Sequence, residues 1–308
     1  MRNLGLLAGL AGLAVSAGCA APNRAIRASY ATYNETIHFN QGQELLLNLV
    51  RLKYRESPLF LKVGALSASY AFQSDAGIGI NRSGGATPYG ITLGGSFSDR
   101  PTITYTPIEG NTFVKQVLAE ISTETFVLLY RSGWPMRTLC HVLAERIEGL
   151  ANDEDHPTYE QFRARVDQLH QARKEDRLEL VTTAENELYL QLDLLDGGGP
   201  VMIPFTAFQL RSFLDVLFFL GKNTEIPAEH QDHVRPSPKN GWLNIRSSPR
   251  EPDDAMVWVE HHGWYFSIAS SDVGSKDTFA LIKLLFQIQA GDIKTVQPIL
   301  TLPVAQPG

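Results

Sequence analysis

Apolar residues alternate with small or polar ones over an unusually long part of this chain. Over residues 66–80 the even positions are mostly apolar, whereas the odd positions are mostly small or polar. The alternation resumes over residues 89–97, after a segment rich in turn-forming residues at 83–88, and residues 102–106 extend it. A period of two over such lengths predicts two long antiparallel strands joined by a turn.

The apolar face of this hairpin has three interpretations. A one-faced antiparallel sheet normally packs against helices of its own domain. Strands of about 9 to 11 residues with this alternation also match membrane-spanning strands. Two strands cannot close a barrel, so residues 66–97 would then have to join copies from other subunits. That pattern resembles lipid-anchored secretion channels of outer membranes, whose barrel is assembled from subunit hairpins. The third interpretation is a soluble hairpin that docks on a partner protein.

Helical periodicity marks several other segments. The first helix is predicted to begin at Asn40, which forms a variant of the capping box with Gln43, and to end before Ser57. Its apolar face contains Leu45, Leu46, Leu49, Val50 and Leu52. Further helices are predicted around Cys140, after Pro157, over residues 205–220 and over residues 279–289.

Two shorter hairpins precede the last two helices. Residues 178–180 and 188–194 form the first hairpin, and residues 201–203 add a short strand. Residues 256–260 and 264–268 form the second hairpin, around His261, His262 and Gly263. Hairpin followed by helix therefore occurs twice, which indicates an internal duplication of structure.

The fold class follows from these elements. We predict an α+β fold of antiparallel hairpins packed with amphipathic helices, including one long hairpin rich in glycine and serine. Residues 30–150 contain the first helix, the long hairpin and further helices, and residues 151–308 contain the two hairpin-plus-helix units. The two regions are also compatible with one continuous domain. Residues 297–304 are predicted to return as a last strand.

The amino terminus has the features of an export signal. Arg2 precedes an apolar run at residues 4–15, and small residues then lead to Cys19. The run is too short to cross a bilayer, which requires about 20 helical residues. The sequence Ser16-Ala17-Gly18-Cys19 resembles the lipobox of bacterial lipoproteins, although serine stands where leucine is usual. An ordinary cleaved secretory signal is the alternative.

The lipobox resemblance implies a location. Residues 1–18 would be the signal peptide, Cys19 would be acylated and become the first residue, and residues 19–29 would be a tether. Ala20 replaces the aspartate that marks retention at the inner membrane in many Gram-negative bacteria, which implies the periplasmic face of the outer membrane. Residues 48–54 also resemble segments of uncharacterised bacterial envelope lipoproteins, and that resemblance implies no activity.

Composition narrows the possible partners. The chain has 308 residues, 44% hydrophobic and 19% charged, so it can bury a substantial core. Its formal net charge is −6 without a long basic run, which argues against nucleic acid as a partner. Acylation of Cys19 would leave Cys140 with no cysteine to pair with, so we expect no disulfide and interpret Cys140 as a small buried hydrophobic residue.

No familiar catalytic motif is present in the sequence. The segment 229–233 puts two histidines and two carboxylates within five residues, but nearby prolines indicate a loop without the rigid spacing of a metal site. His261 and His262 lie at a predicted hairpin turn. We interpret both segments as solvated polar loops, and we assign no catalytic residue, cofactor or metal.

These observations favour a non-enzymatic function in the cell envelope. We predict a lipid-anchored outer-membrane protein that acts as a binding or assembly subunit, with envelope proteins and, in one alternative, further copies of itself as partners. The alternatives are an oligomeric outer-membrane channel that inserts residues 66–97, and a periplasmic hydrolase whose site assembles from residues distant in sequence.

Overall fold

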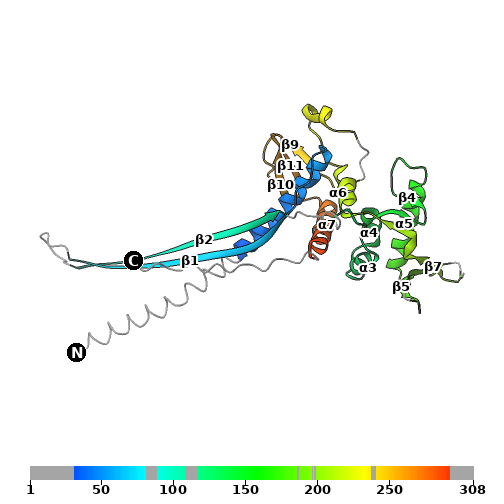
Figure 1. Cartoon of the computed structure of the whole chain (residues 1–308), viewed down its shortest axis with the longest axis horizontal. Coiled ribbons are helices and arrows are strands. Elements are labelled where there is room, and N and C mark those ends of the chain that lie inside the picture. Colours follow the sequence, from blue (N-terminus) through cyan, green and yellow to red (C-terminus); the bar gives the residue numbers. More distant parts are fainter. Residues whose placement is uncertain are drawn as a thin grey trace. The chain divides into compact units, whose positions relative to one another are not determined.

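The chain combines helices with antiparallel sheets, so the predicted α+β class is confirmed (Figure 1). The computed structural model describes residues 31–80, 89–107, 117–185, 187–195, 197, 199–236 and 241–291. The predicted signal peptide, Cys19 and tether lie outside these residues, as does the predicted strand over 297–304.

Two compact units make up the described chain. The larger, which we call the body, holds the described residues of 31–58 and 117–291. The smaller, which we call the hairpin unit, holds those of 59–107. Among the described residues, no helix has the length and apolarity that a membrane span requires.

The hairpin unit consists of β1 (Leu61–Ile80) and β2 (Tyr89–Pro107), which pair antiparallel as predicted. Within the described residues these strands form a two-stranded sheet. Residues directly opposite each other in such a ladder share a face. The register aligns the two apolar series, with Ile80 opposite Tyr89, Ile78 opposite Ile91, Ala76 opposite Leu93 and Phe72 opposite Phe97.

The first described helix of the body covers residues 31–53, and its predicted apolar face is buried. The prediction that it begins at Asn40 is wrong, because residues 31–39 are already helical. These residues are largely exposed, and their few apolar side chains, such as Tyr33 and Ile37, form a weaker stripe than the one over Leu45 to Leu52. The helix ends before Ser57, as predicted.

The middle of the body packs three helices beside a small sheet. The helices are α3 (Thr123–Arg131), α4 (Met136–Leu143) and α5 (Tyr159–Lys174). Strand β3 (Ala144–Ile147) lies between β4 (Leu150–Ala151) and β8 (Phe208–Leu210). Cys140 on α4 is fully buried, which confirms its predicted environment. Burial raises the pKa of its thiol, which therefore stays protonated.

Arg211 joins these elements from inside the core. Its guanidinium donates hydrogen bonds to the backbone carbonyls of His141, Val142, Ala144 and Asn152. Burial lowers its pKa to about 10 although nearby acidic groups oppose that shift, so it remains charged at neutral pH. A buried charge is tolerated because hydrogen bonds replace its hydration.

The predicted helix over 205–220 is wrong in its first half. Residues before it form the sheet β5 (Leu178–Thr182), β6 (Leu188–Leu192) and β7 (Val201–Pro204), as predicted. The 3₁₀ turn η1 (Phe205–Ala207) and β8 follow, because β8 pairs with β3. Only α6 (Phe213–Gly221) is helical, and Ser212 caps it by accepting a hydrogen bond from the Asp215 N–H.

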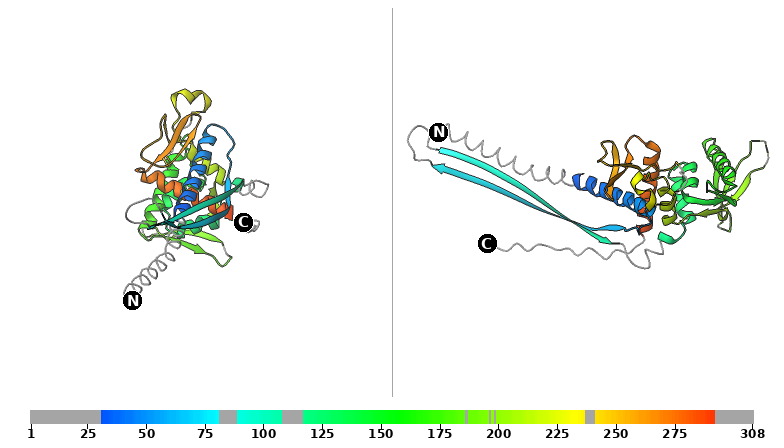
Figure 2. Two further views of the ribbon diagram at one scale, coloured as in Figure 1. Left: turned by 90° about the vertical axis from the view of Figure 1, so that its left-hand side faces the viewer. Right: turned by 90° about the horizontal axis from the view of Figure 1, so that it is seen from above.

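The last part of the body contains η2 (Ala228–His233), β9 (Arg246–Ser248), β10 (Ala255–His261), β11 (Trp264–Ala269) and α7 (Val273–Gly291). Both views of Figure 2 show the helix over 31–53 (blue) beside the β10–β11 hairpin (orange). Gln43 of that helix donates a hydrogen bond to the Trp258 carbonyl of β10. Gly221 of α6 also lies close to it, since a Cβ there would be 3.2 Å from the Leu49 carbonyl oxygen.

Candidate functional site

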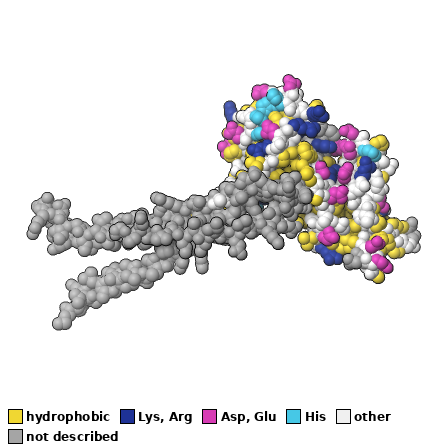
Figure 3. All heavy atoms as spheres, viewed as in Figure 1, with side chains coloured by type: hydrophobic (Ala, Val, Ile, Leu, Met, Phe, Trp, Pro, Cys, Tyr) yellow, Lys and Arg dark blue, Asp and Glu magenta, His cyan; other side chains and the backbone are white. Residues whose placement is uncertain are grey.

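Histidines from two distant segments meet at one cavity in the body. The cavity has a volume of about 630 Å³ and is lined by Tyr54, Glu56, His230, His233 and His262. Figure 3 shows histidine side chains (cyan) gathered on the surface of the body beside acidic and basic ones. Tyr54 and Glu56 follow the helix over 31–53, and the histidines come from η2 and from the β10–β11 turn.

A helix-ending motif places Glu56. Arg55 adopts a left-handed conformation with φ of 65°. Its N–H donates to the Leu52 carbonyl at 3.2 Å, and the Glu56 N–H donates to the Arg51 carbonyl at 2.8 Å. These two bonds form a Schellman motif, in which glycine is the usual left-handed residue. The motif fixes the backbone of Glu56 one residue beyond the left-handed position.

A tight turn places the paired histidines. His261 and Trp264 are the last cross-strand pair of β10 and β11, so only His262 and Gly263 form the loop. Both loop residues have positive φ, 51° and 76°, as the type I′ hairpin turn requires. Histidine at such a position is conformationally strained, and strain of this kind is often found at functional sites.

Glu56 bridges the two turn histidines. Its Oε1 lies 2.7 Å from His262 Nε2, and its Oε2 lies 3.2 Å from His261 Nε2. The second contact has the distance of an ion pair without the geometry of a hydrogen bond, so this buried His261 nitrogen has no hydrogen-bond partner. Its ring therefore presents an unsatisfied nitrogen to the glutamate.

Electrostatics favour an ionised glutamate beside a neutral His261. Burial opposes ionisation of Glu56, but the hydrogen bond from His262, the charges that His261 and His262 carry when protonated, and the charge of Arg51 outweigh it and lower its pKa. Burial lowers the pKa of His261, and the attraction of Glu56 offsets this shift only in part. A neutral imidazole and a carboxylate are the protonation states in which these residues bind metal ions.

Tyr54 packs against the histidine rings. Its ring makes edge or tilted contacts with His230, His261 and His262 at centroid distances of 5.3 to 5.8 Å. Its hydroxyl lies 2.8 Å from His230 Nδ1, and either atom donates according to the histidine tautomer. Burial, with a smaller contribution from Glu56, raises the Tyr54 pKa to about 12, so the phenol stays protonated.

The donor set has a defined chemistry. Two imidazoles and one carboxylate are typical ligands of first-row transition metals. The described residues that line the cavity include no serine, threonine or cysteine. Among these described lining residues, the polar groups are therefore a carboxylate, a phenol and imidazoles.

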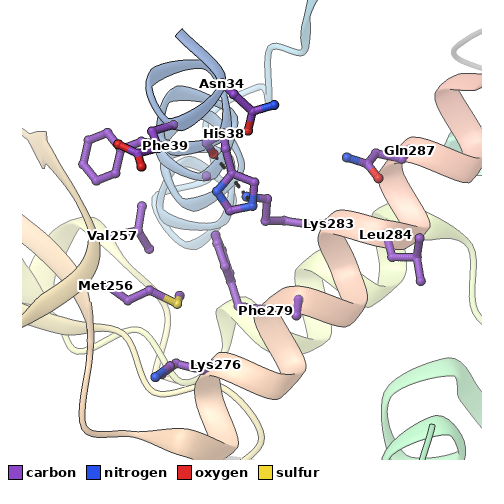
Figure 4. A pocket seen from close by; sticks show the side chains of 13 residues that line it. Asn34, His38, Phe39, Met256, Val257, Lys276, Phe279, Lys283, Leu284 and Gln287 are labelled. Carbon is purple, nitrogen blue, oxygen red and sulfur yellow. Dashed lines mark hydrogen bonds between the residues drawn. The ribbon is translucent and has the colours of Figure 1, made fainter. Parts of the chain in front are cut away.

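A second pocket of about 630 Å³ lies between the helix over 31–53, β10 and α7. Figure 4 shows Phe39, Met256, Val257 and Phe279 on its apolar wall. Lys283 enters it from α7.

The polar groups of this second pocket contact each other. Lys283 Nζ donates to the His38 carbonyl at 3.1 Å and lies 3.1 Å from His38 Nε2. Burial lowers the pKa of Lys283, and the Lys283 charge, with burial, lowers that of His38. Each already has a partner here, whereas the His261 nitrogen does not.

The sequence identified the two histidine segments, but it did not predict that they line the same cavity. The sequence predicts separate polar loops for the pair His230/His233 and for the pair His261/His262. Tyr54 and Glu56 were missed, because they lie 206 residues or more before His262 and no local pattern links them. Glu229 and Asp232, counted as carboxylates of the first segment, are exposed and do not line the cavity. Cys19 lies outside the described residues.

No protein-family model, curated protein or solved structure matches the chain.

Proposed function

We propose that this protein is a lipid-anchored lipoprotein of the outer membrane that faces the periplasm and acts as a non-enzymatic assembly subunit of a cell-envelope complex. Cys19 would carry the lipid, and residues 19–29 would tether the body to the membrane. The hairpin unit would make the contact with the partner protein.

The observation that carries this proposal is the register of β1 and β2. It sets the apolar series of one strand opposite that of the other over a two-stranded sheet. Two strands of 20 and 19 residues leave two long outer edges, and neither pairs with a third strand among the described residues. A hairpin in water is marginally stable by itself, and long open edges are templates for pairing with another chain. A partner that supplies an apolar surface or a further strand would stabilise it.

A second candidate function is an oligomeric outer-membrane channel, and the position of the apolar pairs favours it. Residues 72–80 pair with residues 89–97, giving nine residues on each strand next to the connecting segment. Membrane-spanning strands have about 9 to 11 residues. Hairpins of several copies would then pair edge to edge, because only a closed barrel satisfies every backbone group in lipid.

Photo-crosslinking in intact cells tests the hairpin contact. A photoreactive phenylalanine analogue is introduced at Phe72 or at Gln73, which lie on opposite faces of β1, in the full chain with its native signal. Leu128 on α3, 56% exposed, is the matched control on the body. We expect crosslinks from Phe72 to a different envelope protein, with far fewer from Leu128.

The outcomes separate the two candidates. Crosslinks from Phe72 to a second copy alone would overturn the assembly subunit in favour of the channel. Crosslinks from Phe72 no more frequent than those from Leu128 would contradict both.

The anchor needs its own measurement. Labelled palmitate should enter the wild-type protein but not Cys19→Ala, and mass spectrometry should show an acylated cysteine as the first residue. An unmodified amino terminus on protein isolated from cells would remove the lipid anchor from this proposal.

A further inference from the structure

We propose that Glu56, His261 and His262 form a binding site for one divalent transition-metal ion of the zinc, cobalt, nickel and copper class. The site lies wholly within the body and does not depend on the function proposed for the hairpin unit. An open coordination position would face the cavity that Glu56 and His262 line.

The spacing of the ligand atoms suits a single ion. One carboxylate oxygen of Glu56 and the ring nitrogens of His261 and His262 all lie within 4.8 Å of one another. A tetrahedral zinc ion with bonds of about 2.0 to 2.2 Å holds its ligand atoms roughly 3.4 Å apart. The contacts to Glu56 are shorter, 2.7 Å from Oε1 to His262 and 3.2 Å from Oε2 to His261, so side-chain rotations that move the rings away from the carboxylate would admit the ion.

The unpartnered nitrogen of His261 points to a ligand. This Nε2 atom is buried, and its 3.2 Å contact with the Glu56 carboxylate lacks the alignment of a full hydrogen bond. A buried polar atom without a partner is costly, and a coordinated ion would satisfy it.

The chemistry of the donor atoms favours one class of ion, and the surrounding structure restricts where those atoms lie. Imidazole nitrogens favour zinc, copper, nickel and iron over calcium and magnesium, which prefer oxygen ligands. The backbone on both sides is fixed, by the Schellman motif before Glu56 and by the tight turn at His262. Tyr54 packs on both histidine rings and restricts their orientation.

The ion would join segments that are far apart in the chain. Glu56 follows the helix over 31–53, whereas His261 ends β10 and His262, 206 residues after Glu56, lies in the turn that follows. A ligand that binds only the folded state stabilises it. Metal binding should therefore raise the unfolding temperature of the body.

Metal titration of the whole mature protein tests the site. Protein purified in detergent without a polyhistidine tag is stripped with a chelator and titrated with Co²⁺, whose visible absorption reports coordination by nitrogen and oxygen. Zn²⁺ is then used to displace it. We expect one ion per chain at micromolar or tighter affinity, and a higher unfolding temperature with Zn²⁺.

Matched variants decide whether these residues are the ligands. Glu56→Gln and His262→Gln should each weaken Co²⁺ binding at least tenfold. His262 is 52% exposed, so its replacement should leave the metal-free fold intact. His156→Gln, a histidine bonded to Thr158 outside the cluster, should bind as the wild type does. Absence of Co²⁺ binding, or equal affinity in wild type, E56Q and H262Q, would overturn the proposal.

Discussion

The body and the hairpin unit satisfy their backbone and apolar groups in different ways. The body buries a core drawn from helices and three small sheets, and the buried Arg211 is hydrogen-bonded to four carbonyls. The hairpin unit pairs two long strands with each other. A body of this kind can be stable by itself, whereas an isolated hairpin needs further contacts. The comparison teaches that the body contains the buried core, whereas the hairpin unit is the part for which we propose a partner, and substitutions in each part should separate the two roles.

The largest expected effect is at Arg211. Arg211→Met would remove donors from several buried carbonyls, and we expect a loss of about 4 kcal/mol in the free energy of unfolding. All four tryptophans, at positions 134, 242, 258 and 264, belong to the body, so their fluorescence during denaturant unfolding reports the body alone. Arg137→Ala is the control, because its ion pair with Asp167 is half exposed and contributes at most about 1 kcal/mol. Equal losses in the two variants would contradict the central role of Arg211.

Acid should destabilise the body through His141. Burial, and then the charge of Arg137, lowers its pKa from 6.5 to about 4, and Asp167 offsets this only in part. Below pH 6.5 the His141 side chain is protonated in the unfolded chain, whereas in the folded body it stays neutral until the pH falls to about 4. The stability present above pH 6.5 is therefore lost as the pH falls through this window, by up to about 3 kcal/mol.

Denaturant unfolding at pH 7, 5.5 and 4.5 measures this loss. Titration of other groups is common to wild type and His141→Gln, so the difference between their slopes isolates the histidine. A slope that is the same in both proteins would show that the ring is protonated in the folded state.

Two glycines of the body should respond to alanine with opposite signs. A Cβ at Gly221 would lie 3.2 Å from the Leu49 carbonyl oxygen, so Gly221→Ala should cost about 1 kcal/mol. A Cβ at Gly42 would meet Val257 at an ordinary 3.5 Å, so Gly42→Ala should gain up to about 1 kcal/mol from helix propensity. The same fluorescence measurement compares them, and stabilisation by Gly221→Ala would show that the two helices can separate at low cost.

The smallest effect on the body is expected from the hairpin. Phe72→Asp should change the unfolding free energy of the body by less than about 0.5 kcal/mol, because the residue belongs to the other unit. Gln73→Asp is the control on the opposite face. A drop of several kcal/mol in tryptophan-monitored unfolding for Phe72→Asp alone would show that the body depends on the apolar face of the hairpin.

Local sequence patterns predicted most of the helices and strands. They failed where the secondary structure of a segment depends on a partner strand distant in the sequence. Alternation over 66–80 and 89–97 predicted β1 and β2, since the period of a strand is a property of neighbouring residues. The helix predicted over 205–220 failed because β8 finds its partner in β3, about 60 residues earlier. The start of the first helix failed because its first residues are mostly exposed and their apolar members do not extend the broad stripe that begins at Leu45.

The sequence by itself determined the α+β class, the long hairpin and the buried state of Cys140, because each depends on composition or on a period that neighbouring residues carry. Only the tertiary structure decided that Glu56 meets His261 and His262, and that Arg211 is bonded inside the core. Those contacts join residues about 60 to more than 200 positions apart, and their distances are fixed by the packing of whole elements rather than by any local pattern.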